Sequence, residues 1–168
     1  METTIKLYSL KVNELKAYTF ASLFIVGNIV LPQVCHLLPM GGQMLLPIYF
    51  FTLIAAYKYG FVTGLLTAVA SPLVNHFLFG MPATEMLPIL LIKSGLLATA
   101  ASYVAYRTKE VKLQSLLLII LFYQGIGTIA EFALTGSMFT ALQDIRLGLA
   151  GMLLQLVGGY YILKAIKK

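Results

Sequence analysis

Gln124, Thr128 and Glu131 lie in one of the most apolar stretches of the chain, and their types and spacing are suited to holding a polar ligand. On an α-helix, residues at i, i+4 and i+7 share one face. A charged residue inside a membrane costs roughly 2.5–3.5 kcal/mol, and such residues usually face a bundle interior or a cavity. The stretch therefore predicts a polar site within a helical bundle, although Gln124 could instead form a hydrogen bond between helices.

The composition points to a membrane protein. Hydrophobic residues make up 60% of the 168 residues and charged residues 11%, whereas soluble domains carry about 25% charged residues. A bilayer core about 30 Å thick needs roughly 20 apolar residues per helix, so the chain has room for about six helices. We expect a single all-α transmembrane domain, residues 1–168. Walker A, CxxC and HExxH motifs do not occur, so we expect no enzyme activity, no cofactor and no metal.

Charges, prolines and glycines divide the chain into six predicted spans, at about residues 16–38, 45–57, 61–79, 86–106, 113–134 and 145–166. The second is short for a complete crossing, and only "YKYG" links it to the third, so a tight, buried helical pair is expected. The segment "LPMGGQMLLP" predicts a structured loop. No small-residue cleavage site follows the first span, so we expect a retained helix.

The lysines and arginines predict the orientation of the six spans. With the N-terminus inside, and therefore also the C-terminus, the inner side collects Lys6, Lys11, Lys16, Lys58, Arg107, Lys109, Lys112, Lys164, Lys167 and Lys168. The outer side and the outer half of the helices keep Lys93 and Arg146. This asymmetry follows the positive-inside rule. The net charge of +6 is then a record of topology, and we expect no nucleic-acid partner.

Polar residues concentrate in the outer half of the later spans. Glu131 lies roughly 27 Å along its helix from Leu113, near the outer boundary. Asp144, Gly148, Gly151, Gln155 and Gly158 give the last span a matching face. The inner halves of these helices are almost wholly apolar, which predicts a cavity open to the outside and closed below. The predicted substrate-binding residues are Gln43, Asn75, His76, Glu85, Lys93, Gln124, Glu131, Asp144, Arg146 and Gln155.

Other roles are open for several of these residues. Glu131 and Lys93 could form a structural ion pair, or Glu131 could be solvated at the headgroup level. Arg146 lies roughly opposite Asp144 on a helix, so only one of the two should face the cavity. A histidine such as His76 more often forms a hydrogen bond at an interface than binds a metal ion.

The first span begins with "AYTFA", in which Ala17 and Ala21 form an A-x-x-x-A motif, and Gly64 and Ala68 belong to a stripe of small residues in the third. Such stripes allow close helix approach, most often within one molecule. Together with six short spans, an inner N-terminus and a structured first outer loop, the motif resembles a substrate-binding S component of the energy-coupling factor (ECF) vitamin transporters.

The resemblance implies a multi-pass protein of a prokaryotic cytoplasmic membrane that captures a scarce vitamin or precursor from outside. It implies docking onto a coupling membrane protein driven by two cytoplasmic ATPases, with Ala17, Ala21, Gly64 and Ala68 as the docking positions. The substrate site would lie under the first outer loop, near Gln43.

The charges also suggest a ligand class. The chain begins Met1-Glu2 where nickel and cobalt members of the family have Met-His, and it lacks the tryptophan that thiamine binders favour. A carboxylated vitamin facing Lys93 or Arg146, or a heterocyclic vitamin or base precursor, fits the predicted set.

Three other functions remain possible on the sequence alone. A proton-coupled carrier would use Glu131 as its proton site, although no internal repeat suggests alternating access. An intramembrane hydrolase would need a Gly-x-Ser-Gly frame, which Ser137 in "TGSM" lacks. A membrane scaffold would bind no ligand at all.

Overall fold

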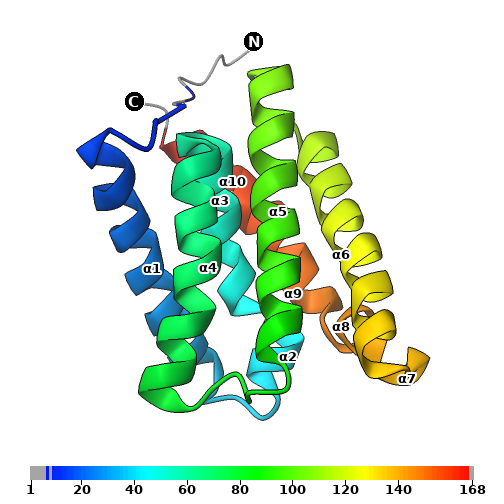
Figure 1. Ribbon diagram of the computed structural model, residues 1–168. Helices are drawn as coiled ribbons and strands as arrows, with labels where there is room; N and C mark the ends of the chain where they lie inside the picture. Colours follow the sequence, from blue (N-terminus) through cyan, green and yellow to red (C-terminus); the bar gives the residue numbers. More distant parts are fainter. Residues whose placement is uncertain (1–6, 8, 167–168) are drawn as a thin grey trace.

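The chain forms a bundle of helices of unequal length (Figure 1). The computed structural model describes residue 7 and residues 9–166, and no β-strand occurs in this part of the chain. The elements in chain order are α1 (Leu15–Cys35), α2 (Gly41–Leu45), the 3₁₀ helix η1 (Pro47–Tyr49), α3 (Phe50–Tyr59), α4 (Phe61–Phe79), α5 (Leu87–Thr108), α6 (Leu113–Thr135), α7 (Met138–Ala141), α8 (Gln143–Leu147), α9 (Leu149–Leu153), the π-helix η2 (Leu154–Gly158) and α10 (Gly159–Ala165).

Four of the described helices, α1, α4, α5 and α6, are long and apolar enough to cross a membrane. A bent pair, Met138–Leu147 and Leu149–Ala165, meets the same criterion if it is counted as one span. The bend of 51° falls at Gly148, so the sixth span predicted over residues 145–166 contains a break near its start. The predicted all-helical fold is confirmed for the described residues, with four or five helices able to span a membrane in place of the six predicted.

The predicted second span, residues 45–57, corresponds to η1 and α3, which are too short to cross. α3 has ten residues, about 15 Å of helix against a hydrocarbon core about 30 Å thick. Nine of its ten residues are buried, so almost no part of it contacts lipid. Irregular backbone is tolerated at membrane depth only where protein surrounds it, and α3 with its preceding loop meets that condition.

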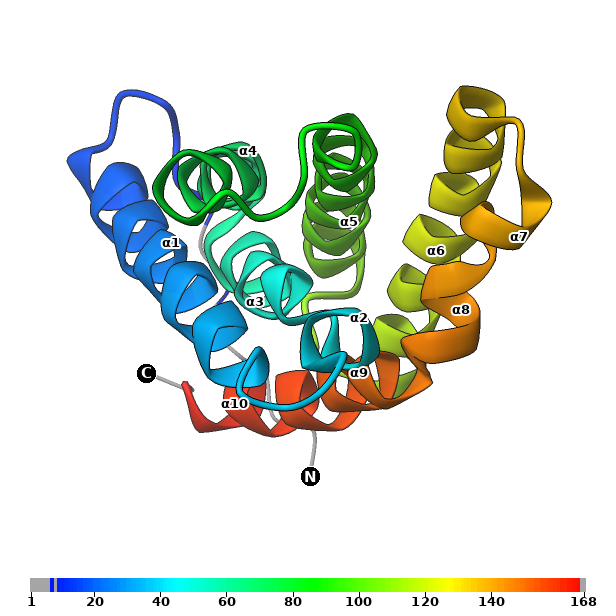
Figure 2. The ribbon, with the colours of Figure 1, turned by 90° about the horizontal axis from the view of Figure 1, so that it is seen from below.

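The long helices are arranged around α3. Figure 2 shows α1, α4, α5 and α6 as an arc, with α9 and α10 on the remaining side. α3 contacts α1, α4, α5 and α10, and η2 contacts α6. The core of the bundle is therefore centred on a helix that the sequence predicted only as a short span. Its fully buried side chains include Leu53, Ile54, Ala55 and Ala56.

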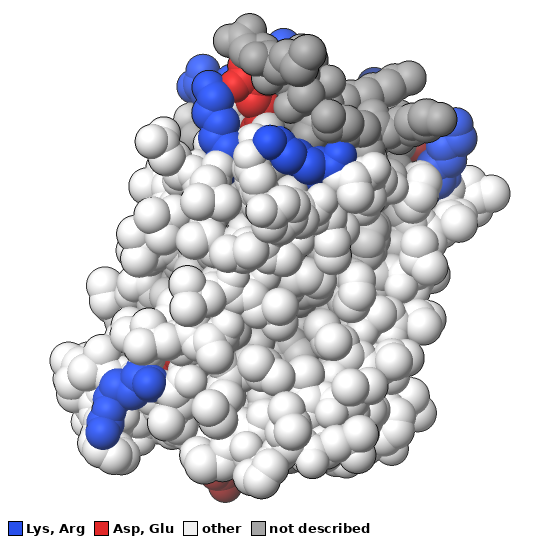
Figure 3. All heavy atoms as spheres, turned by 180° about the vertical axis from the view of Figure 1, so that it is seen from behind, with Lys and Arg blue, Asp and Glu red and all other residues white. Residues whose placement is uncertain are grey.

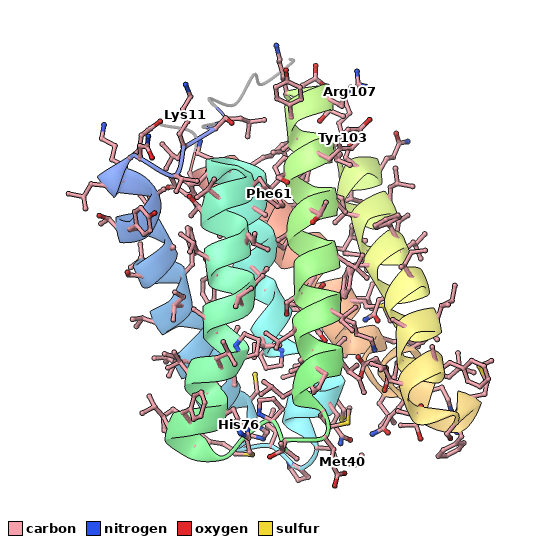
Figure 4. All side chains as sticks on the ribbon, viewed as in Figure 1. Lys11, Met40, Phe61, His76, Tyr103 and Arg107 are labelled. Atoms are coloured by element: carbon pink, nitrogen blue, oxygen red, sulfur yellow. The ribbon has the colours of Figure 1, made fainter. Side chains whose placement is uncertain are left out.

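Lysines and arginines gather at one end of the molecule, called the basic end here, where α1 begins and α10 ends (Figure 3). Figure 4 places Lys11 and Arg107 there, and Met40 and His76 at the opposite end, called the cavity end. Lys93 lies in the second turn of α5, which begins at the cavity end, and Arg146 belongs to α8 near the same end (Figure 1). The described lysines and arginines are thus separated along the molecule, with Lys58 buried within α3, and the side of a membrane on which each end lies stays a prediction. Lys6, Lys167 and Lys168 lie outside the described residues.

A buried hydrogen-bond network centred on Asn28 joins α1, α3 and α4. The Asn28 amide donates to Thr52 Oγ1 at 3.0 Å and to Ser71 Oγ at 3.1 Å. Its carbonyl oxygen accepts from the backbone N–H of Phe51 at 3.3 Å. That N–H belongs to the first turn of α3, where helix geometry supplies no partner. One side chain therefore fixes the start of α3 against its two neighbours.

Asn28→Ala should lower stability because it leaves the Phe51 N–H without its partner inside the bundle. We expect a loss of about 1–3 kcal/mol, measured by thermal unfolding of the detergent-solubilised protein. Ser22→Ala is the matched control, because Ser22 is exposed on the same helix. Equal melting temperatures for the two variants would show that the network does not hold α3 in place.

Candidate functional site

An ion cluster joins three helices near the cavity end. Lys93 of α5 donates to Glu131 Oε2 of α6 at 2.5 Å and to Asp144 Oδ2 of α8 at 2.7 Å. Lys93 and Glu131 are 0% and 2% exposed, whereas Asp144 is 20% exposed. One ammonium and two carboxylates give the cluster a net charge of −1 in their ionised forms. Glu131 and Lys93 are therefore ion-paired, and Glu131 is not a solvated headgroup-level residue.

Gly127 provides the space that the ion cluster needs. It lies one helical turn before Glu131 on α6, on the face turned toward α5. A Cβ added at Gly127 would come within 2.6 Å of Cγ of Lys93. This role of Gly127 was not predicted from the sequence, where its only signal is a glycine four residues before the glutamate.

The predicted polar face of α6 is confirmed as a buried face. Gln124, Thr128 and Glu131 are all buried. Gln124 donates to the hydroxyl of Tyr123 at 3.3 Å, and that hydroxyl donates to Oε1 of Gln155 at 2.9 Å. Gln124 and Gln155 thus form part of a chain of hydrogen bonds between α6 and η2. The bond between the two helices is the one from Tyr123 to Gln155, and Gln124 contacts only Tyr123 of its own helix.

A cavity of about 390 Å³ lies at the cavity end. It is enclosed by the end of α1, by α2 and η1, by the segment between α4 and α5, and by α8. Its volume falls within the range of about 300–1,000 Å³ that is usual for small-molecule sites. The structure therefore has a cavity under the first loop, where the substrate site was predicted.

Polar side chains distinguish the cavity from an apolar void: Gln33, His36 and Gln43 line it, together with Tyr49, Asn75 and Asp144. Asn75 and Tyr49 are 3% and 1% exposed, and neither Oδ1 of Asn75 nor the Tyr49 hydroxyl has a partner among the described residues. Asp144 also lines the cavity, so it belongs both to the cavity wall and to the ion cluster. Buried polar atoms are normally hydrogen-bonded, and unpaired ones call for an explanation such as a ligand or a water molecule. Tyr49 was not among the residues predicted from the sequence to bind substrate.

The loop that covers the cavity packs tightly on α9. A Cβ added at Gly151 would come within 2.4 Å of the backbone carbonyl of Leu45. Leu46, which follows, has a φ of 47° and is buried against the cavity. A non-glycine residue in this conformation is strained, and it persists where its surroundings hold it. Gly151 permits the close contact that holds this loop.

The other predicted substrate-binding residues differ in their surroundings. Gln43 is exposed and lines the cavity. His76 lies beside the cavity, and its Nδ1 forms a 2.7 Å hydrogen bond with the carbonyl of Pro82. Glu85 is exposed outside the cavity. Arg146 is also exposed, with its guanidinium 4.7 Å from the ring centroid of Phe139, so of the pair Asp144 and Arg146 it is Asp144 that faces the cavity.

The four predicted docking residues are buried within the bundle. Ala17 and Ala68 are 0% exposed, Ala21 is 2% exposed, and Gly64 is buried against Ala56. These contacts are intramolecular, which is the more common use of small-residue stripes. A partner could contact these four positions only if the bundle opened.

A larger cavity, of about 720 Å³, lies at the basic end beside Phe61 and Tyr103 (Figure 4). Two of its polar lining groups already have partners: the Tyr57 hydroxyl donates to the carbonyl of Glu110, and Ser102 donates to the carbonyl of Thr99. No unpartnered buried polar atom lies among its described lining residues. The smaller cavity is therefore the better candidate for a specific ligand.

Lys93→Met should be strongly destabilising because it leaves two carboxylates close together without a cation. Breaking a buried ion pair costs about 3–5 kcal/mol, measurable by unfolding in mixed micelles. The double variant Lys93→Met/Glu131→Gln should recover part of that loss, because it removes one of the two unpaired charges. A double variant no more stable than the single one would contradict this account of the cluster.

Gly151→Ala should displace the loop that covers the cavity, because its new Cβ meets backbone and not a flexible side-chain end. We expect a loss of about 1–3 kcal/mol and faster hydrogen exchange in the segment 41–47. Gly125→Ala is the matched control, since a Cβ there meets nothing within 4 Å. Unchanged exchange in Gly151→Ala would mean that the loop does not depend on this contact.

Comparisons with protein families, curated proteins and solved structures found no match for this chain. The chemistry of the cavity is thus inferred from the residues that line it.

Proposed function

We propose that this chain is a substrate-capturing membrane subunit that works as the S component of an ECF-type importer. The observation that carries the proposal is the cavity at the cavity end, with Asn75 Oδ1 and the Tyr49 hydroxyl buried and unpaired beside Asp144. Each unpaired buried polar group costs free energy, and these two differ from the other unpaired buried atoms, on Thr63, Ser94, Gln124, Thr128 and Gln155, because they belong to residues that line a cavity.

The distribution of charge supports capture from outside the cell. The positive-inside rule puts the basic end in the cytoplasm, so the cavity end faces outward. The bundle between the two ends is filled by α3, whose side chains from Leu53 to Ala56 are 0% exposed. A site that is accessible from one side only suits a subunit that hands its substrate to a partner.

The proposed partners are a coupling membrane protein and two cytoplasmic ATPases. Docking would use a surface other than Ala17, Ala21, Gly64 and Ala68, because these four are enclosed in this state. The side of α1 that is turned away from the bundle carries exposed apolar side chains, including Leu23, Val26 and Val30. We assign this surface to contact with lipid or with the coupling protein.

The proton-coupled carrier is a second candidate because of the ion cluster. Two carboxylates share the ammonium of Lys93, and protonation of Glu131 or Asp144 would neutralise the cluster. A carrier of this kind would work without ATPases and would respond to a pH gradient.

Purification of the tagged chain from native membranes in mild detergent separates the two functions. The S component should co-purify with a coupling membrane protein and two ATPases, and proteoliposomes of that complex should accumulate the small molecule released from the purified chain only when ATP is supplied. Uptake by the chain alone, driven by a pH gradient without ATP, would support the carrier and contradict the S-component proposal. Glu131→Gln should abolish uptake only in the carrier.

A further inference from the structure

The cavity at the cavity end is acidic. Among its described lining residues Asp144 is the only acidic one, and none is lysine or arginine. Lys93 does not line the cavity, and its ammonium already contacts two carboxylates. Arg146 is exposed outside it. The two cations to which the sequence analysis assigned a ligand carboxylate are therefore not available on the cavity wall.

Asn75 and Asp144 offer acceptors to a ligand, beside Gln33, His36 and Gln43, which also line the cavity. Both amide hydrogens of Asn75 are used, because its Nδ2 donates at 2.9 Å to the carbonyl of Asn28 and at 2.9 Å to the carbonyl of Ser71. Both partners are carbonyl oxygens, so the amide orientation is fixed and Oδ1 is the atom left for a ligand. Asp144 uses Oδ2 for Lys93, and its other oxygen accepts no hydrogen bond from the described residues.

Much of the remaining wall is apolar, although Gln33, His36 and Gln43 also line it. Pro47 and Ile48 of η1, Met81 and Met86 between α4 and α5, and Leu90 of α5 contribute hydrophobic surface. An apolar wall with a few convergent polar atoms is typical of small-molecule sites, where the polar atoms fix orientation and specificity. The unpaired Tyr49 hydroxyl can donate or accept, so it can bind a second polar group.

From these groups we infer that the cavity binds a small molecule with an apolar or aromatic body and a cationic N–H donor group, such as a protonated amine or an amidinium. The cation binds the Asp144 carboxylate, and an N–H of the ligand donates to Oδ1 of Asn75. The inference rests on the proposed role of this cavity in capture, and it adds the charge class of the cargo.

The test compares three probes that share one carbon skeleton: benzylammonium, benzoate and benzyl alcohol. Each is titrated into the full chain in detergent, and saturable binding is followed by calorimetry and by the rise in melting temperature. Benzylammonium should bind best. Asp144→Asn should weaken its binding by about tenfold or more, which corresponds to about 1.4 kcal/mol. This variant keeps the Lys93–Glu131 pair and removes one of two carboxylates, so it should fold.

Two further variants make the result specific. Glu85→Gln is the matched control, because Glu85 is an exposed acid outside the cavity, and it should leave benzylammonium binding unchanged. Tyr49→Phe removes only an unpaired hydroxyl, so it should fold as well as the parent protein while binding benzyl alcohol less tightly.

Stronger binding of benzoate than of benzylammonium would overturn the charge class and leave capture by this cavity standing. Benzylammonium binding that is unchanged in Asp144→Asn, or no saturable benzylammonium binding, would also overturn the inference. The proposed S-component function fails on a separate result, namely ATP-independent uptake or purification without ATPases.

Discussion

An ammonium group at membrane depth must have a counter-charge, and this requirement organises the cavity end of the bundle. Lys93 lies on α5 and can meet Glu131 only if α6 packs close beside it, which Gly127 allows. It can meet Asp144 only if α8 turns back toward the bundle, which the break at Gly148 allows. The positions of α6 and α8 relative to α5 are therefore coupled through one side chain.

The same cluster connects the scaffold to the cavity. Asp144 is the least buried of the three charged residues, and it faces the cavity as well as Lys93. A ligand that binds its carboxylate competes with Lys93 for the same charge, whereas Glu131 keeps Lys93 paired. The second carboxylate thus lets the site exchange one partner without leaving an ammonium unpaired in a medium of low dielectric constant.

Helical periodicity was enough to predict the polar face of α6, because Gln124, Thr128 and Glu131 repeat at the helix period in an otherwise apolar segment. Helical periodicity also predicted that only one of Asp144 and Arg146 would face inward, but it could not show which one. That choice depends on the position of Lys93, which is a tertiary contact. The burial of Ala17 and Ala21 was equally undetermined, because a small residue allows close approach to any helix, whether in the same chain or in a partner.

Other features left little trace in the sequence. Asn28 is an isolated polar residue in a long apolar helix, and its role becomes visible only when Thr52 and Ser71 are brought beside it. α3 was predicted as a short span because its composition is that of a membrane helix. Its enclosure on all sides depends on how four other helices pack, and no local pattern encodes that arrangement.

The enclosure of α3 has a consequence for how the molecule could move a solute. The cavity ends on η1, directly at the first turn of α3, and below it the side chains of that helix are tightly enclosed. This cavity shares no lining residue with the larger cavity at the basic end. For the proposed capture role, passage of a bound molecule to the opposite end would therefore require that the helices separate or that the whole bundle reorients.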